Sequence, residues 1–157
     1  MQGANLILID AAVTGHTIGE GKALNEQFVS LYRGLDDEDI EQVGPYLFSF
    51  SAGSAFAHWV IDRVWGGRTG VLIKSSAGLE ECLLHFQQHL FKKDGRGKDQ
   101  YFRFYDPRVL KTYLPACDKN ELAGFFGPVE KFIMEGESSE EAVEYGLLSG
   151  ILQRHIL

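Results

Sequence analysis

Two aspartates stand at the ends of predicted strands, where carboxylates could do chemistry. Asp10 follows the apolar residues 6–9, and Asp106 follows the aromatic segment 101–105. In α/β sheets ligands gather at the carboxyl ends of strands, and two carboxylates there could hold a divalent cation or act as acid and base. The simpler interpretation, which we favour, makes Asp106 the cap of the next helix and Asp10 a turn residue.

A second group of reactive side chains lies on one predicted helix. Cys82, His85 and His89 share a narrow arc of that helix, so a metal site is conceivable. The arc overlaps the apolar stripe of the helix and no fourth ligand is evident, so we interpret the three as packing residues. The glycine-rich residues 66–70 lead from a helix into a strand, the reverse of a phosphate-binding loop. We expect no metal, no cofactor and no catalytic residue.

The elements that position these residues are six strands alternating with amphipathic helices. The strands are expected at residues 6–10, 28–32, 46–50, 71–74, 101–105 and 131–134. The helices are expected at residues 52–65 and 79–91, and after the caps Asp106 and Asp118. Residues 94–99 are expected to form a mobile surface loop.

The pattern predicts a single layered α/β domain with a mixed, largely parallel sheet of about five or six strands, helices on both faces and a C-terminal helix. Residues 6–9 and 71–73 are apolar at every position, which is typical of strands covered on both sides. We therefore expect these two strands at the centre of the sheet.

The tail, residues 137–157, is predicted to be an amphipathic helix beyond a main domain of residues 1–136. Ser138 and Glu141 have capping-box spacing, and Val143, Leu147 and Ile151 recur every four residues. This apolar face must be buried against the domain, against a second copy or against a partner. The sequence leaves the oligomeric state open.

The composition narrows the class of partner. The 157 residues carry a formal net charge of −7, which argues against nucleic acid and against an anionic membrane surface. The apolar run at residues 6–9 is too short for a signal peptide, and no stretch reaches the ~20 apolar residues of a membrane span. The two cysteines lie in apolar helical contexts, so we expect a reduced, cytoplasmic protein.

The most unusual segment is YFRFYDPRVL, residues 101–110, an aromatic strand that runs into a capped helix. It resembles the signature of the type VI secretion effector-chaperone family, the Tec- or VasW-like adaptors formerly called a domain of unknown function. The pieces that agree in order and spacing are residues 8–12, 43–47, 65–66, 70–75, 79–83 and 125–129.

The resemblance implies a non-catalytic bacterial adaptor. Such a protein recognises a toxic effector in the cytoplasm and helps to load it onto the secreted spike protein. The candidate partner-binding residues are Arg103, Tyr105, Asp106, Arg108, Val143, Leu147 and Ile151. Within the signature we expect architecture first, with Arg103 or Arg108 paired to a carboxylate and Asp106 capping a helix.

Two other functions remain open at this point. The first is a small metal-dependent hydrolase that uses Asp10 and Asp106, which requires the two carboxylates to converge in an open pocket. The second is a structural subunit that oligomerises through the tail.

Overall fold

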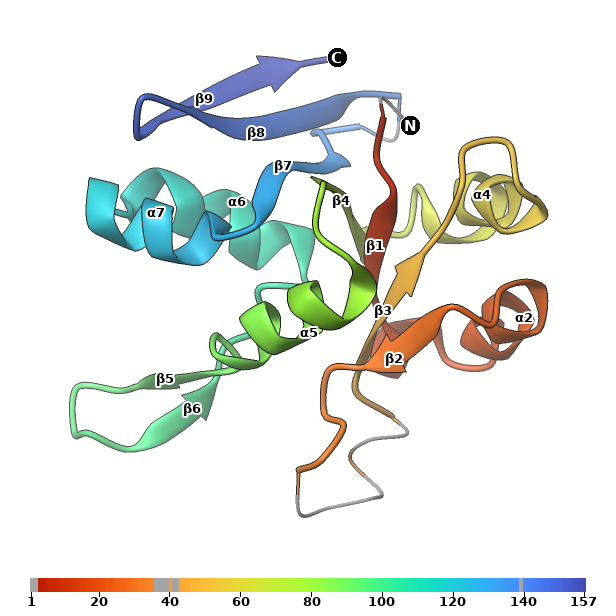
Figure 1. The fold of residues 1–157 in the computed structure, drawn as a ribbon, viewed down its shortest axis with the longest axis horizontal. Helices are drawn as coiled ribbons and strands as arrows, with labels where there is room; N and C mark the ends of the chain where they lie inside the picture. The colour runs from red at the N-terminus through yellow and green to blue at the C-terminus, as the bar shows by residue number, and fades with distance from the viewer. Residues whose placement is uncertain (1–2, 36–39, 41–42, 139) are drawn as a thin grey trace.

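The computed structural model describes residues 3–35, 40, 43–138 and 140–157 (Figure 1). It contains a seven-stranded sheet and a separate two-stranded sheet. The strands are β1 (Leu6–Asp10), β2 (Phe28–Ser30), β3 (Pro45–Ser49), β4 (Gly70–Ser75), β5 (Phe91–Lys93), β6 (Asp99–Tyr101), β7 (Val129–Glu135), β8 (Ala142–Leu148) and β9 (Ile151–Ile156). The helices are α1 (Ala11–Thr14), α2 (Thr17–Leu24), α4 (Ala55–Trp59), the π-helical turn η1 (Val60–Val64), α5 (Leu79–Gln87), α6 (Pro107–Ala116) and α7 (Lys119–Phe126).

The large sheet is antiparallel throughout. Its order is β2-β3-β1-β4-β7-β8-β9, and each neighbouring pair runs in opposite directions. The prediction of a largely parallel sheet is therefore wrong. The chain does cross over through helices from β1 to β2 and from β3 to β4, but each crossover skips one strand, and that strand runs the opposite way. Alternation of strands and helices along the sequence predicts such crossovers without showing which strand fills the gap.

The two strands that are apolar on both faces lie side by side inside the sheet, as predicted. β1 pairs with β3 and β4, and β4 pairs with β1 and β7. Leu6 and Leu8 enter one core cluster, whereas Ile7 and Ile9 enter the other. Figure 1 shows α2 and α4 on one side of these strands and α5, α6 and α7 on the other. A strand that is apolar on both faces thus indicates a sheet with helices packed on both faces. It does not indicate whether the neighbouring strands are parallel or antiparallel.

The tail is a β-hairpin, so the predicted C-terminal helix is also wrong. β8 pairs with β7 and β9 pairs with β8, which extends the main sheet by two strands. A spacing of four residues fits a helix, but it is also a multiple of the two-residue period of a strand. The decisive local signal is Ser149-Gly150, where both residues have positive φ, the conformation of a tight two-residue hairpin turn.

The signature segment contains less strand than predicted. β6 ends at Tyr101, and residues 102–106 form an irregular turn that leads into α6. Residues 94–98, which we expected within a loop, form the tip of the β5–β6 hairpin. There the Asp94 carboxylate accepts hydrogen bonds from the backbone N–H groups of Arg96 (2.8 Å) and Lys98 (2.9 Å). This hairpin projects from the body of the molecule (Figure 1).

The predicted helix starts at Asp106 and Asp118 are confirmed. Asp106 caps α6, and Asp118 forms a capping box with Glu121 at the start of α7. The helix expected from residue 52 begins instead at Ala55, where Ser54 is the cap of α4. None of the helices in the described residues is both long and apolar enough to span a membrane.

Candidate partner-binding site

The signature is held by three parts of the chain that lie far apart in sequence. These are the end of β1 at Asp10, the turn after β2 at Tyr32, and the turn of residues 102–106 before α6. The first interaction joins Arg103 to Asp10, across 93 positions of sequence. The Arg103 Nη2 donates to the Asp10 Oδ2 at 2.6 Å, and the other carboxylate oxygen accepts from the backbone N–H of Ala12 at 3.0 Å.

Asp10 is therefore a cap and an ion-pair partner at once. Its side chain is 5% exposed, while that of Arg103 is 46% exposed. The hydrogen bond to Asp10 raises the pKa of the Arg103 guanidinium above its usual value. Asp10 fixes one end of Arg103, and solvent or a partner can reach the rest. The turn role that we expected for Asp10 is in fact the cap of the one-turn helix α1.

The second interaction is a pair of tyrosine hydroxyls. Tyr32 Oη and Tyr105 Oη lie 3.1 Å apart, and both side chains are buried. Burial raises the pKa of both phenols above the usual value for tyrosine, so both stay protonated at neutral pH. Gly44 packs directly behind Tyr32, since a Cβ atom there would lie 2.2 Å from the ring. Tyr32 is a site residue that the sequence did not reveal.

The third interaction joins Asp106 to Arg108, and it confirms the predicted cap. Asp106 Oδ1 accepts from the Arg108 backbone N–H (2.9 Å) and Nε (3.0 Å), and Oδ2 accepts from Nη2 (2.7 Å). Burial alone would raise the pKa of the Asp106 carboxyl, but the bonds from Arg108 outweigh it, so this pKa lies below its usual value. The prediction that Arg103 or Arg108 pairs with a carboxylate is confirmed for both.

The three interactions leave two open hollows on the surface. One, of about 390 Å³, is lined by Asp10, Tyr32, Tyr101, Arg103 and Tyr105 among others. The second, of about 500 Å³, is lined by Asp106, Arg108, Val109, Thr112 and Tyr113. The two carboxylates that a hydrolase would use thus line separate hollows, and each already accepts hydrogen bonds from an arginine.

Comparison with known families gives one match. The family model for a domain of unknown function (DUF4123) fits residues 7–124, about three quarters of the chain. The chain belongs to the DUF4123 family. No curated protein and no solved structure matches it. The matched residues include all three interactions of the signature, whereas β7, β8 and β9 lie outside them.

Cys82 and His85 of α5, and His89 just after it, pack against other residues of the DUF4123 domain. Cys82 is buried and its thiol lies 3.6 Å from the Ser75 hydroxyl, to which it donates. His85 donates through Nε2 to the backbone carbonyl of Phe125 at 2.7 Å, and the His89 ring packs on the edge of the Phe125 ring. Among the described residues, no group of three or more histidine, cysteine, aspartate or glutamate side chains is placed to hold a metal ion.

The predicted tail residues do not share one face. Val143 is buried in the core and Leu147 packs at its margin, on the same side of β8. Ile151 pairs with Leu148, so it points to the opposite side, where both residues are exposed. The signature divides in a similar way, since Tyr105 and Asp106 are buried while the arginines Arg103 and Arg108 reach the surface. The arginines of this DUF4123 domain therefore offer most of the exposed area of the signature, whereas Tyr105 and Asp106 contribute only small parts of the walls of the two hollows.

Proposed function

We propose that this protein is a non-catalytic adaptor that binds a type VI secretion effector and helps to load it onto the secreted spike protein. The observation that carries the proposal is the DUF4123 match over residues 7–124, because this family is associated with chaperones of such effectors. An effector must be captured before it leaves the cell, so the adaptor acts in the bacterial cytoplasm.

The geometry of the signature supports a binding role. Arg103 and Arg108 each have one side fixed by a buried or capping carboxylate, so their guanidinium groups are presented in defined positions. Tyr101 is an exposed aromatic residue beside Arg103 in the same hollow. Arginine and tyrosine contribute strongly at protein interfaces, since they offer large contact areas and several hydrogen bonds. We assign this surface to the effector or the spike protein.

The direct experiment first identifies a toxin gene and a spike-protein gene in the neighbourhood of this gene, and then co-expresses their products with the adaptor. The tagged adaptor should retain the toxin through affinity purification and gel filtration. Arg103→Met and Arg108→Gln keep much of each side chain's stem, and both should weaken the complex. Arg96→Gln, on the exposed tip of the β5–β6 hairpin, is the matched control and should have no effect. If neither toxin nor spike protein is retained by the unaltered adaptor, the proposal is wrong.

A further inference from the structure

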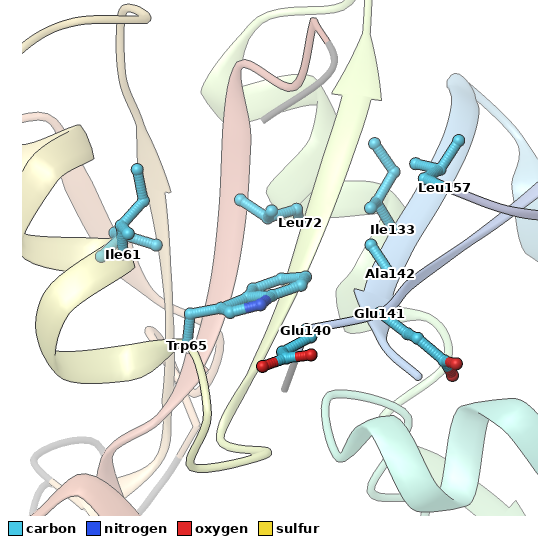
Figure 2. A pocket seen from close by; sticks show the side chains of 9 residues that line it. Ile61, Trp65, Leu72, Ile133, Glu140, Glu141, Ala142 and Leu157 are labelled. Atoms are coloured by element: carbon cyan, nitrogen blue, oxygen red, sulfur yellow. The ribbon is translucent and has the colours of Figure 1, made fainter. Parts of the chain in front are cut away.

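An apolar hollow lies between η1 and the tail hairpin. It has a volume of about 310 Å³, and Figure 2 shows that its side chains come from the middle of the chain (60–72) and from its C-terminal part (133–157). Its floor is formed by Leu72 of β4 and Ile133 of β7, and its walls include Ile61, Trp65 and Leu157. The residues of the floor belong to the core cluster under α2 and α4, whereas the tyrosines of the signature belong to the other cluster. The hollow is therefore a different surface from the signature.

The walls of the hollow expose apolar area that the fold itself does not require. Ile61 is 51% exposed and Leu157 is 42% exposed. Leu148 and Ile151 lie on the same face of the sheet at the other end of the β8–β9 hairpin, separated from the hollow by Glu144, Gly146, Gln153 and His155, so they are not part of it. A cluster of exposed large apolar side chains around a concave floor is typical of a site for another molecule.

The rim of the hollow is acidic. Among the described residues that line it, the only charged ones are Glu140 and Glu141, and both are exposed. Figure 2 places the Glu140 carboxylate beside the Trp65 ring, while the side chain of Glu141 points away. The nearby Arg68 guanidinium is directed to the backbone carbonyl of Glu137 at 2.8 Å. With a net charge of −7 on the whole chain, this surface favours a cationic partner.

We propose that this hollow binds a short amphipathic segment of the effector, with one or two large apolar side chains on the floor and a lysine or arginine beside Glu140. The proposal rests on the adaptor function for the identity of its partner. A volume near the lower end of the ~300–1,000 Å³ of ligand pockets suits a few side chains rather than a large cofactor. Recognition of an amphipathic segment through apolar anchors and one flanking charge is a common mode of peptide binding.

Two variants test the site, each with a matched control. Ile61→Asp places a charge in the hollow, and Leu84→Asp is its control because Leu84 is 56% exposed on α5, which packs on the other core cluster. Glu140→Lys reverses the charge beside Trp65 and makes the rim formally neutral, and Glu26→Lys makes the same change at an exposed position between α2 and β2. All four positions are on the surface, so each variant should fold.

The first measurement needs no effector. A twelve-residue helical peptide of leucine and lysine is titrated into the protein while methyl NMR signals are followed, and a leucine–glutamate peptide is the comparison. The lysine peptide should shift the methyl signals of Ile61, Ile133 and Leu157, and it should bind at least tenfold more tightly than the glutamate peptide. Ile61→Asp and Glu140→Lys should each weaken it about tenfold, and the controls should not. Shifts confined to other methyl groups, or equal losses in the controls, would overturn the proposal.

The second measurement uses the neighbouring toxin and the same four variants. Loss of toxin with the two hollow variants alone supports the proposal. If the toxin is retained equally by all four, the hollow is not its site, although the adaptor function stands. If the unaltered protein retains no toxin, the adaptor function fails, and the lysine-peptide titration then decides whether the hollow is a cationic-segment site.

Discussion

Replacing Arg103 by methionine should destabilise the protein even though the arginine lies at the surface. The change removes the 2.6 Å bond from Arg103 to Asp10. The Asp10 side chain is only 5% exposed, and its carboxylate then keeps the bond from the Ala12 backbone N–H. Methionine keeps most of the aliphatic stem, so little packing is lost. The loss of unfolding free energy therefore measures the cost of leaving the buried Asp10 carboxylate without its ion-pair partner.

The expected loss of stability follows from the different burial of the two partners, because Asp10 is buried and Arg103 is half exposed. A hydrogen bond to a charged group contributes about 1.5–3 kcal/mol, and the larger cost falls on the partner that stays buried. Arg103 is nearly half exposed, which lowers the strength of the pair through solvent screening. We expect a loss of about 2 kcal/mol in the free energy of unfolding, or a fall in Tm of roughly 4–8 °C for a chain of this size. Removing the charge as well, with Asp10→Asn, should recover part of this loss.

The assay is urea unfolding of the wild type, the two single variants and the double variant. The double-mutant cycle should give a coupling energy of about 1–2 kcal/mol, since the residues are in direct contact. Arg96→Met on the β5–β6 hairpin tip should change stability by less than about 0.5 kcal/mol. If Arg103→Met is as stable as the wild type, or if the two single changes simply add, then the pair does not hold the signature to β1.

Three other changes test other parts of the fold. The pKa of Asp106 is lower in the folded protein than its usual ~3.9, so its charge contributes stability above about pH 4 that is lost as the pH falls through the folded pKa. The difference in unfolding free energy between wild type and Asp106→Asn should therefore shrink below pH 4. A difference that stays constant with pH would contradict this. A chain that ends at Glu137 lacks β8 and β9, including the buried Val143, and should show no cooperative thermal transition by circular dichroism; a sharp transition would mean that the hairpin is dispensable. Gly44→Ala places a methyl group 2.2 Å from the Tyr32 ring and should cost about 1–3 kcal/mol in chemical denaturation, whereas unchanged stability would show that the ring can move aside.

Local rules predicted the parts of this fold that depend on neighbouring residues. Helix caps at Asp106 and Asp118 follow from one side chain and the next three backbone groups, and the structure confirms both. The central positions of β1 and β4 follow from their unbroken apolar character, because only strands covered on both faces tolerate it.

Features that depend on distant residues could not be predicted in the same way. The direction of a strand is set by which other strand lies beside it, and β1 comes between β3 and β4 only in the folded chain. Arg103 was expected to find a carboxylate, but its partner lies 93 residues away, and nothing in the spacing identifies Asp10 rather than another acid. The tail failed for a different reason: Val143 and Leu147 are four residues apart, which fits a helix and a strand equally, and Ile151 continued that spacing although it lies beyond the turn, on the opposite face.

The tail also changes how the DUF4123 match should be understood in this chain. The matched residues end at 124, yet β4 pairs with β7 from Leu72 to Ser75. Phe132 and Met134 of β7 are buried in the same core as the signature residue Phe104. Without β7, one edge of β4 and one side of that core would be uncovered, so the matched residues and the strands that follow them form one cooperative sheet. The signature lies in the matched part, whereas Ile133, Leu157 and Glu140 of the apolar hollow lie in the strands and turn beyond it. Under the proposed adaptor function, we therefore expect differences in effector between family members to be accommodated at the hollow, because part of its lining lies outside the matched residues while the ion pairs of the signature lie inside them.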